Sequence, residues 1–268
     1  MAMVGFFPIP TSSSGAAYGG AAGEPRAVST SSQAVCERDH VLVMAHRGTG
    51  SGTRSIGGRT FSENTIPAFI KALRDGADGF DADCWPTADG RIATHHDDTL
   101  DRMTDGRGRI GGRSWAQIAS VRNASGATIP SFETVVTAMR GDGGHRQQEI
   151  KQGALFSDPL LRHMIEVVQQ VPDAYDRVLY PSSEKMTLRR IHAIAPRIRL
   201  GLIKRTTTGR PAIEVLPEWL DVVLIDLRAA DGAYVRQALD MGYEVSVRGV
   251  ETVAQLREAV AIGARPGS

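Results

Sequence analysis

Histidines and acidic residues recur in four short groups of this chain, and each group ends or follows a short apolar segment. The groups are His46-Arg47-Gly48, Asp81-Ala82-Asp83, His96-Asp97 and Glu149-Ile150-Lys151. Two imidazoles can exchange a proton near neutral pH, and three carboxylates can hold a hard divalent cation. Arginine and lysine side chains can bind phosphate oxygens. Together, these groups supply the chemistry needed to cleave a phosphodiester.

Asp81 and Asp83 are two residues apart in a segment that is expected to be extended. Their side chains should therefore lie on the same face of a strand. Two carboxylates held so close repel each other unless a cation or a proton lies between them. With Glu149 from another strand they form an oxygen-only set, which suits Mg²⁺ or Ca²⁺ better than Zn²⁺. A lone Asp-x-Asp pair usually lies on a solvated surface. The metal site is therefore predicted from this pair together with the histidine and glutamate motifs that accompany it.

Length and composition indicate one large α/β domain. The chain has 268 residues, of which 41% are hydrophobic and 23% charged, enough to bury a substantial core. The net charge of +1 provides no strong field for nucleic acid or an anionic membrane, so neither is an expected partner. No apolar run approaches the roughly 18 residues of a membrane-spanning helix. The two cysteines, Cys36 and Cys84, imply no disulfide framework.

The first forty residues differ from the rest of the chain. Thr11 to Gly23 is rich in serine, glycine and alanine, which cannot bury enough apolar surface to offset the entropy of ordering. We therefore predict a flexible arm over residues 1–40 and a folded domain over residues 41–268. Met1 to Pro10 has no basic residue and is interrupted by glycine and proline, so it is not a standard signal peptide. This favours a cytoplasmic location over secretion.

From Val41 onward, apolar strand-like segments alternate with amphipathic helical ones, which is typical of a parallel sheet covered by helices. Strands are expected over 41–45, 79–83, 92–95, 148–151, 177–180, 198–203, 221–227 and 243–247. Helices are expected over 65–75, 131–139, 159–171, 184–195, 233–241 and 251–262. A closed (β/α)8 barrel and an open doubly wound sheet both fit this order. The polar groups lie at or just after strand ends, which favours the barrel.

The order of these motifs resembles the glycerophosphodiester phosphodiesterase family. The motifs that carry the resemblance also include Glu63-Asn64-Thr65, Gly76-Ala77-Asp78, the segment from Thr99 to Gly106, and Ile129-Pro130-Ser131-Phe132. The likeness is specific from Val41 to Lys151 and continues more weakly to Gly263. It implies a TIM-barrel-like fold and metal-dependent hydrolysis of a small glycerophosphodiester to glycerol phosphate and an alcohol.

The resemblance also implies a role for each residue that matches a family motif. His46 and His96 correspond to the acid/base pair. Asp81, Asp83 and Glu149 correspond to the metal ligands, Arg47 and Lys151 to phosphate contacts, and Glu63 and Asn64 to a supporting motif beside the site. We hypothesise that one histidine activates the substrate's own adjacent hydroxyl while the other protonates the leaving alcohol, through a cyclic phosphate. His95 should point away from His96 and serve as a wall residue.

The sequence departs from the family pattern in three places. The family usually has glutamate where Asp81 stands. The segment between Gly48 and Glu63 is longer than usual and could be a lid over the pocket or an inert insertion. Near the end, Ser246-Val247-Arg248-Gly249 replaces a Trp-Thr-Val-Asn-like strand, and no later segment matches the final family motif. We therefore expect an incomplete final strand, whose exposed edge the arm or a second subunit of a homo-oligomer would cover.

Two alternatives to a glycerophosphodiester hydrolase remain open. The first is a related phospholipase-D-like phosphodiesterase or lyase that acts on another lipid headgroup or specialised metabolite and stops at the cyclic phosphate. The second, of a different class, is a catalytically inactive barrel that binds a phosphorylated ligand. Such a protein would be expected to have lost a catalytic histidine or a metal carboxylate, and here all five of these positions are filled by capable residues.

Overall fold

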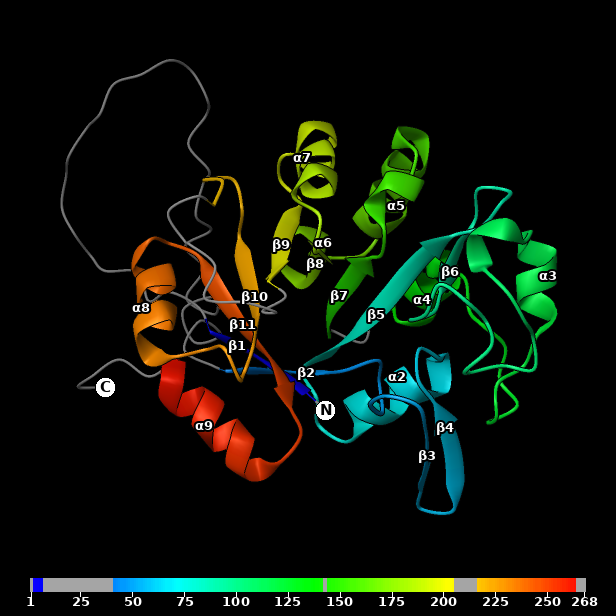
Figure 1. Cartoon of the computed structure of the whole chain (residues 1–268), viewed down its shortest axis with the longest axis horizontal. Helices are drawn as coiled ribbons and strands as arrows, with labels where there is room; N and C mark the ends of the chain where they lie inside the picture. The colour runs from blue at the N-terminus through cyan, green and yellow to red at the C-terminus, as the bar shows by residue number, and fades with distance from the viewer. Residues whose placement is uncertain (1, 7–40, 142–143, 205–215, 264–268) are drawn as a thin grey trace.

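The structure is a computed structural model, and it describes residues 2–6, 41–141, 144–204 and 216–263. Within these ranges the chain forms a nine-stranded sheet that curls on itself, with helices on its outer side and a separate two-stranded hairpin (Figure 1). Helices alternate with strands along the sequence, as the apolar pattern predicted, and α9 (Val253–Gly263) follows the last strand.

Seven parallel strands form an incomplete (β/α) barrel. They are β2 (Leu42–Ala45), β5 (Gly79–Pro86), β7 (His145–Ile150), β8 (Val178–Ser182), β9 (Arg199–Lys204), β10 (Val222–Asp226) and β11 (Glu244–Val250). Each is hydrogen-bonded in parallel to the next one in this order. The barrel is therefore the correct choice between the two predicted layouts.

An antiparallel strand from the N-terminus bridges the two ends of this parallel array. β1 (Ala2–Phe6) pairs with β11 on one side and with β2 on the other, so that Val4 lies opposite both Val247 and Val43. The edge that an incomplete final strand would expose is thus paired, and the N-terminal segment supplies the partner. Ala2–Phe6 form a strand, although the sequence predicted a flexible arm here. Residues 7–40 of that arm, including Cys36, lie outside the described residues.

The helices lie outside the barrel. They are α2 (Ile66–Arg74), α3 (Trp115–Ser120), α4 (Phe132–Ala138), α5 (Asp158–Gln169), α6 (Ala174–Arg177), α7 (Lys185–Ile194), α8 (Gly232–Asp240) and α9 (Val253–Gly263). Thr65, Ser131, Ser157 and Asp231 cap four of them, each accepting a backbone N–H three residues later. The described residues also include two short 3₁₀ turns, Ile110–Gly112 and Gly153–Leu155.

The main hydrophobic core lies between the sheet and the helices, where Val223, Val235 and Val247 are fully buried. A smaller apolar cluster that includes Met44 and Leu224 contains residues from the parallel strands alone and occupies the barrel interior. Along each strand, side chains therefore point alternately into the core beneath the helices and into the barrel interior. This alternation decides which side chains can reach the mouth of the barrel.

The long segment after Gly48 forms a hairpin of β3 (Thr53–Ile56) and β4 (Arg59–Ser62), which projects from the barrel (Figure 1). A Cβ at Gly48 would lie 2.7 Å from the backbone carbonyl carbon of Ala68, and its φ is +86°. Glycine is required here because no side chain fits this close approach. A further short strand, β6 (Ile92–Thr94), pairs antiparallel with the end of β5.

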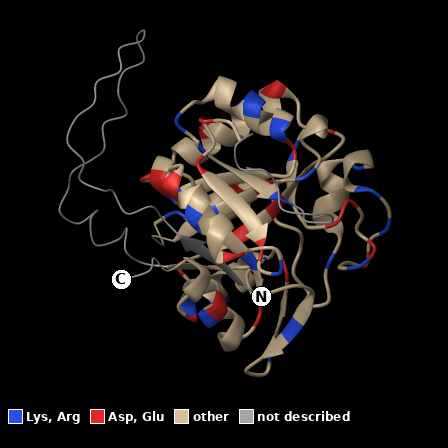
Figure 2. Cartoon of the chain, turned by 60° about the vertical axis from the view of Figure 1, so that its left-hand side comes forward, with Lys and Arg blue, Asp and Glu red and all other residues tan. Residues whose placement is uncertain are grey.

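Basic and acidic residues are interspersed over the visible helices (Figure 2), as expected for a net charge near zero. In the described part of the chain, no helix is long and apolar enough to cross a membrane.

Candidate functional site

The predicted carboxylates lie on two neighbouring strands, toward the end of the barrel at which β2 stops. Asp81 and Asp83 are inside β5, which continues to Pro86 although the strand was predicted to end at Asp83. β5 and β7 pair in parallel, with Asp81 opposite Gln147 and Asp83 opposite Glu149. All three carboxylates are buried, with relative exposures of 1–4%. Because the two aspartates are two residues apart on one strand, they share a face with each other and with Glu149 across the sheet. The sequence-predicted convergence of these residues on one end of the barrel is therefore present in the fold.

His46 and Arg47 form the turn that follows β2. Arg47 has a φ of 52°, and Asn64 and Gln152, which also border this end of the barrel, have φ values of 54° and 40°. Such left-handed conformations cost energy in residues other than glycine and are common at functional sites. The turn lets the Arg47 backbone N–H donate to Asp81 Oδ1. It also places His46 Nε2 4.0 Å from Asp81 Oδ2.

Asp83 is held by three side chains. Asn64 Nδ2 donates to Asp83 Oδ2 at 2.7 Å, Lys151 Nζ lies 2.9 Å from Asp83 Oδ1, and Arg47 Nε lies 3.5 Å from Asp83 Oδ2. Lys151 Nζ also lies 2.6 Å from Glu149 Oε1. The lysine ammonium group thus lies between the carboxylates of β5 and β7. Burial alone would raise the pKa of Asp83, but the charges of Lys151, His96 and Arg47 outweigh it and lower that pKa.

The carboxylate set fits a hard cation by chemistry, although the side chains are not gathered around one point. Among the described residues, no three His, Cys, Asp or Glu side chains are placed to hold one metal ion. Burial and the nearby charge of Asp83 raise the pKa of Asp81 to about 7, which indicates an excess of negative charge. An all-oxygen set with excess negative charge suits Mg²⁺ or Ca²⁺. The assignment of Asp81, Asp83 and Glu149 as metal ligands stays a prediction.

His96 belongs to a chain of ion pairs that runs along the mouth of the barrel. His96 Nδ1 lies 2.7 Å from Asp97 Oδ1, and Arg102 Nε donates to Asp97 Oδ2 at 2.5 Å. Arg102 Nη2 then donates to Glu63 Oε1 at 2.6 Å, and Arg47 Nη1 donates to the same oxygen at 3.1 Å. Glu63 therefore contacts Arg47, and Asn64 contacts Asp83, so both lie beside predicted site residues. Their supporting role stays a prediction. The network links His96 to Arg47 through alternating charges.

The two predicted histidines differ in their surroundings. His46 is 4% exposed, and burial, together with the charge of Arg47, lowers its pKa to about 3. His96 has a side chain that is 31% exposed. Burial alone would raise the pKa of Asp97, but hydrogen bonds from Arg102 and His96 lower it to about 2. Asp97 is thus a permanent carboxylate that orients His96.

His95 points away from this network. Its Nε2 lies 3.0 Å from the carbonyl oxygen of Thr99, and the residue is 4% exposed. Trp85 Nε1 donates to the carbonyl oxygen of His96 at 3.0 Å, while its ring packs in a cluster with Leu100. The tryptophan therefore both fixes the backbone at His96 and contributes to the core.

Two arginines of the site had no predicted role. Arg102 lies in the Thr99–Gly106 motif. Its position five residues after Asp97 was the sequence signal that could have indicated their ion pair. Arg248 lies in the segment that departs from the family pattern, and its Nη2 is 3.8 Å from Glu149 Oε2. Ion pairing across a barrel joins residues that are distant in sequence, so spacing alone does not reveal it.

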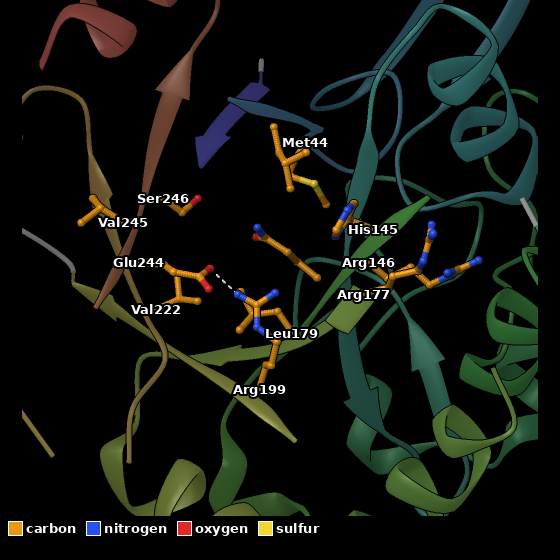
Figure 3. Close-up of a pocket in the computed structure, with 12 residues that line it drawn as sticks. Met44, His145, Arg146, Arg177, Leu179, Arg199, Val222, Glu244, Val245 and Ser246 are labelled. Atoms are coloured by element: carbon orange, nitrogen blue, oxygen red, sulfur yellow. Dashed lines mark hydrogen bonds and ion pairs between the residues drawn. The ribbon is translucent and has the colours of Figure 1, made fainter. Parts of the chain in front are cut away.

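A small cavity lies at the opposite end of the barrel interior. Its volume is about 40 Å³, and Figure 3 shows Met44, Leu179 and Ser246 around it. Arg199 and Glu244 form an ion pair at its wall. The cavity is bordered by the starts of the strands, whereas the carboxylates and histidines described above lie at their ends.

A parallel barrel with polar groups at the carboxyl ends of its strands is typical of TIM-barrel enzymes. The sequence matches the Glycerophosphoryl diester phosphodiesterase family over residues 46–265. The chain therefore belongs to this family of phosphoric diester hydrolases.

Individual relatives agree with this assignment. The chain is 28% identical over 169 residues to a glycerophosphodiester phosphodiesterase of Caldanaerobacter subterraneus, a match that spans 60% of this chain and 66% of that protein. It is 35% identical over 232 residues to a Mycobacterium tuberculosis protein named "Probable glycerophosphodiester phosphodiesterase 1", covering 73% and 80% of the two chains. Its fold is similar to that of an Oleispira antarctica phosphodiesterase in complex with the product sn-glycerol-3-phosphate, with a TM-score of 0.70 and 22% identity. That match covers 82% of this chain and 89% of the other.

Proposed function

We propose that this chain is a divalent-metal-dependent phosphodiesterase that hydrolyses a glycerophosphodiester to glycerol phosphate and an alcohol. One arrangement carries the proposal. In a chain that belongs to this family, the imidazole of His46 lies beside the buried carboxylate of Asp81, and that of His96 lies close enough to Asp83 to lower the pKa of that carboxyl. A pair of groups that can exchange protons beside a cation site is what phosphodiester cleavage needs.

The two histidines divide the proton transfers between them. His46 accepts the proton of the substrate's adjacent hydroxyl, whose oxygen then attacks phosphorus. The phosphorus–oxygen bond to the alcohol breaks, and the leaving oxygen takes a proton from His96. The product of this step is a cyclic phosphate, which water opens with the two roles reversed. The contact between Asp97 and His96 Nδ1 leaves Nε2 of that ring for the transfer.

The cation would be held by Asp81, Asp83 and Glu149. When bound, Mg²⁺ or Ca²⁺ supplies positive charge that stabilises the negative charge of the transition state. Lys151 and Arg47 hold the carboxylates by ion pairs and can also contact phosphate oxygens. Asp81 is one methylene shorter than the usual family glutamate. The position that its carboxylate can take toward a cation therefore depends on the hydrogen bond that Asp81 Oδ1 accepts from the Arg47 backbone N–H.

Phosphorus NMR of a panel of glycerophosphodiesters tests this function directly. The wild-type protein should convert the substrate to glycerol phosphate, lose activity in EDTA and regain it with Mg²⁺ or Ca²⁺. Asp83→Asn should lower turnover at least 100-fold, whereas Asp176→Asn, an exposed aspartate on α6, should leave it unchanged. Activity that resists EDTA would contradict the metal assignment.

The same spectra separate the alternatives. Accumulation of a cyclic phosphate with no glycerol phosphate would favour the phospholipase-D-like reaction. Binding of glycerol phosphate without turnover of any diester in the panel would favour the inactive barrel.

A further inference from the structure

Arg248 lies near the carboxyl end of β11, in the segment that replaces the Trp-Thr-Val-Asn-like strand of the family. β10 and β11 pair in parallel, with Asp226 opposite Arg248. Glu244 and Ser246, earlier on the same strand, line the interior cavity at the opposite end of the barrel (Figure 3). Strand alternation therefore puts Arg248 on the inner face, at the end where the carboxylates and histidines lie.

A β-bulge sits at this point of β11. The register with β1 shifts between Ala2 and Val4, so that Arg248 and Gly249 together face a single β1 residue. Gly249 has a φ of 85°, and the Leu227 N–H donates to the carbonyl oxygen of Arg248 at 2.8 Å. Bulges bend a strand and redirect its side chains, and they often occur beside active sites. The backbone at Arg248 is thus bent by the bulge and departs from regular strand geometry.

The guanidinium group of Arg248 makes weaker contacts than the other cations of the site. Its Nη2 lies 3.8 Å from Glu149 Oε2, which is beyond hydrogen-bond distance, and its side chain is 17% exposed. Lys151, Arg47 and Arg102 each have a nitrogen within 3.1 Å of a carboxylate oxygen. In the ranges that the structure describes, Glu149 is the sole ion-pair partner of Arg248. Its N–H donors are therefore available to a ligand.

Arg248 also lies close enough to act on the reacting groups. Its positive charge contributes to lowering the pKa of His46 and opposes the rise in the pKa of Asp81. A phosphate that enters between these groups would bring negative charge to a place already crowded with carboxylates. A guanidinium fork can bind two oxygens of such a phosphate at once.

We propose that Arg248 is a substrate-binding residue that donates hydrogen bonds to non-bridging oxygens of the phosphate, from the side of the barrel formed by β11. This inference rests on the proposed function, because it assigns a ligand of the same site. Arg248 adds hydrogen-bond donors to those of Arg47 and Lys151, which are also engaged in ion pairs with carboxylates.

The test compares Arg248→Gln and Arg248→Lys with Arg257→Gln, which changes an exposed arginine on α9. Isothermal titration calorimetry measures binding of sn-glycerol 3-phosphate, and steady-state kinetics measure glycerophosphodiester hydrolysis. Hydrogen bonds to a charged group contribute enough for Arg248→Gln to weaken binding about 10- to 100-fold. Arg248→Lys should keep part of the affinity, and Arg257→Gln should stay within twofold of wild type. Matching far-UV circular dichroism and thermal midpoints would confirm that each variant is folded.

The outcomes distinguish this inference from the proposed function. If wild type hydrolyses the diester and Arg248→Gln has a product affinity and kcat/KM within twofold of wild type, the role of Arg248 is wrong and the function stands. If wild type binds sn-glycerol 3-phosphate through Arg248 but hydrolyses no diester, the function fails and the phosphate site stands. If wild type neither binds nor hydrolyses, both are wrong.

Discussion

Replacing Glu63 with glutamine tests the ion-pair network that joins His96 to Arg47. The Glu63 carboxylate accepts hydrogen bonds from Arg47 at 3.1 Å, from Arg102 at 2.6 Å and from the backbone N–H of Gly52. Glutamine keeps the shape but has one acceptor oxygen and no charge, so at least one charge-assisted hydrogen bond is lost. The amide N–H₂ group of the glutamine would also face one of these N–H donors, to which it cannot form a hydrogen bond.

The expected loss of stability follows from how exposed each partner is. The Arg102 side chain is 43% exposed and can be solvated again, so its ion pair contributes about 0–1 kcal/mol. The Arg47 side chain is 11% exposed and would lose its closest carboxylate, leaving Asp83 at 3.5 Å. A buried hydrogen bond to a charged group contributes about 1.5–3 kcal/mol. We therefore expect Glu63→Gln to lower the free energy of unfolding by about 2–3 kcal/mol.

Urea unfolding at a series of pH values measures this loss. Burial alone would raise the pKa of Glu63, but the hydrogen bond from Arg102 and the charge of Arg47 lower it below its ordinary value of 4.5. A carboxyl group with a lowered folded-state pKa stabilises fully above its unfolded pKa, and this contribution disappears as pH falls. The difference between wild type and Glu63→Gln should therefore be largest above pH 5 and shrink toward pH 3.

A matched control is Glu166→Gln, which removes an exposed carboxylate from α5 and should change stability by less than about 0.5 kcal/mol. A loss below 1 kcal/mol for Glu63→Gln at pH 7, or a loss that does not depend on pH, would refute the reasoning.

Three further predictions concern other parts of the molecule. His96→Ala should lower turnover about 10²- to 10⁴-fold with little change in thermal midpoint; a loss below tenfold would contradict its acid/base role. Cys84 is fully buried, and burial raises the pKa of its thiol well above 9, so peptide mapping should show alkylation at least tenfold slower in the folded protein than in urea. Val4→Pro removes a backbone donor from a strand with neighbours on both sides, and should lower the thermal midpoint by roughly 5 °C or more. An unchanged midpoint would show that β1 does not stabilise the barrel.

Much of the parallel barrel could be predicted because its strands and helices carry local signals. Short apolar runs marked β2, β5 and β10, and the helix predicted to begin at residue 131 is α4, which Ser131 caps. The order of the strands also indicated that Asp83 and Glu149 would lie side by side, since parallel strands share their carboxyl edge.

Local sequence signals are weaker for features that depend on contacts between distant segments. β1 contains no strong turn or cap, and its role is defined by pairing with β2 and β11. The segment that forms the hairpin of β3 and β4 was predicted to be either a lid or an inert insertion, and its many glycines and arginines did not indicate strands. The contacts of Arg102 with Glu63 and of Arg248 with Glu149 join residues that are far apart in sequence, and residue spacing does not encode them.

The pairing of β1 with β11 joins the first described residues of the chain to its last strand. Closing so large a loop is entropically costly, and contacts between segments far apart in sequence slow folding. The ribosome synthesises β1 long before its partner β11, so the two strands cannot pair until β11 has been made. Closure of the barrel is thus expected to be a late folding event, completed after synthesis of nearly the entire domain.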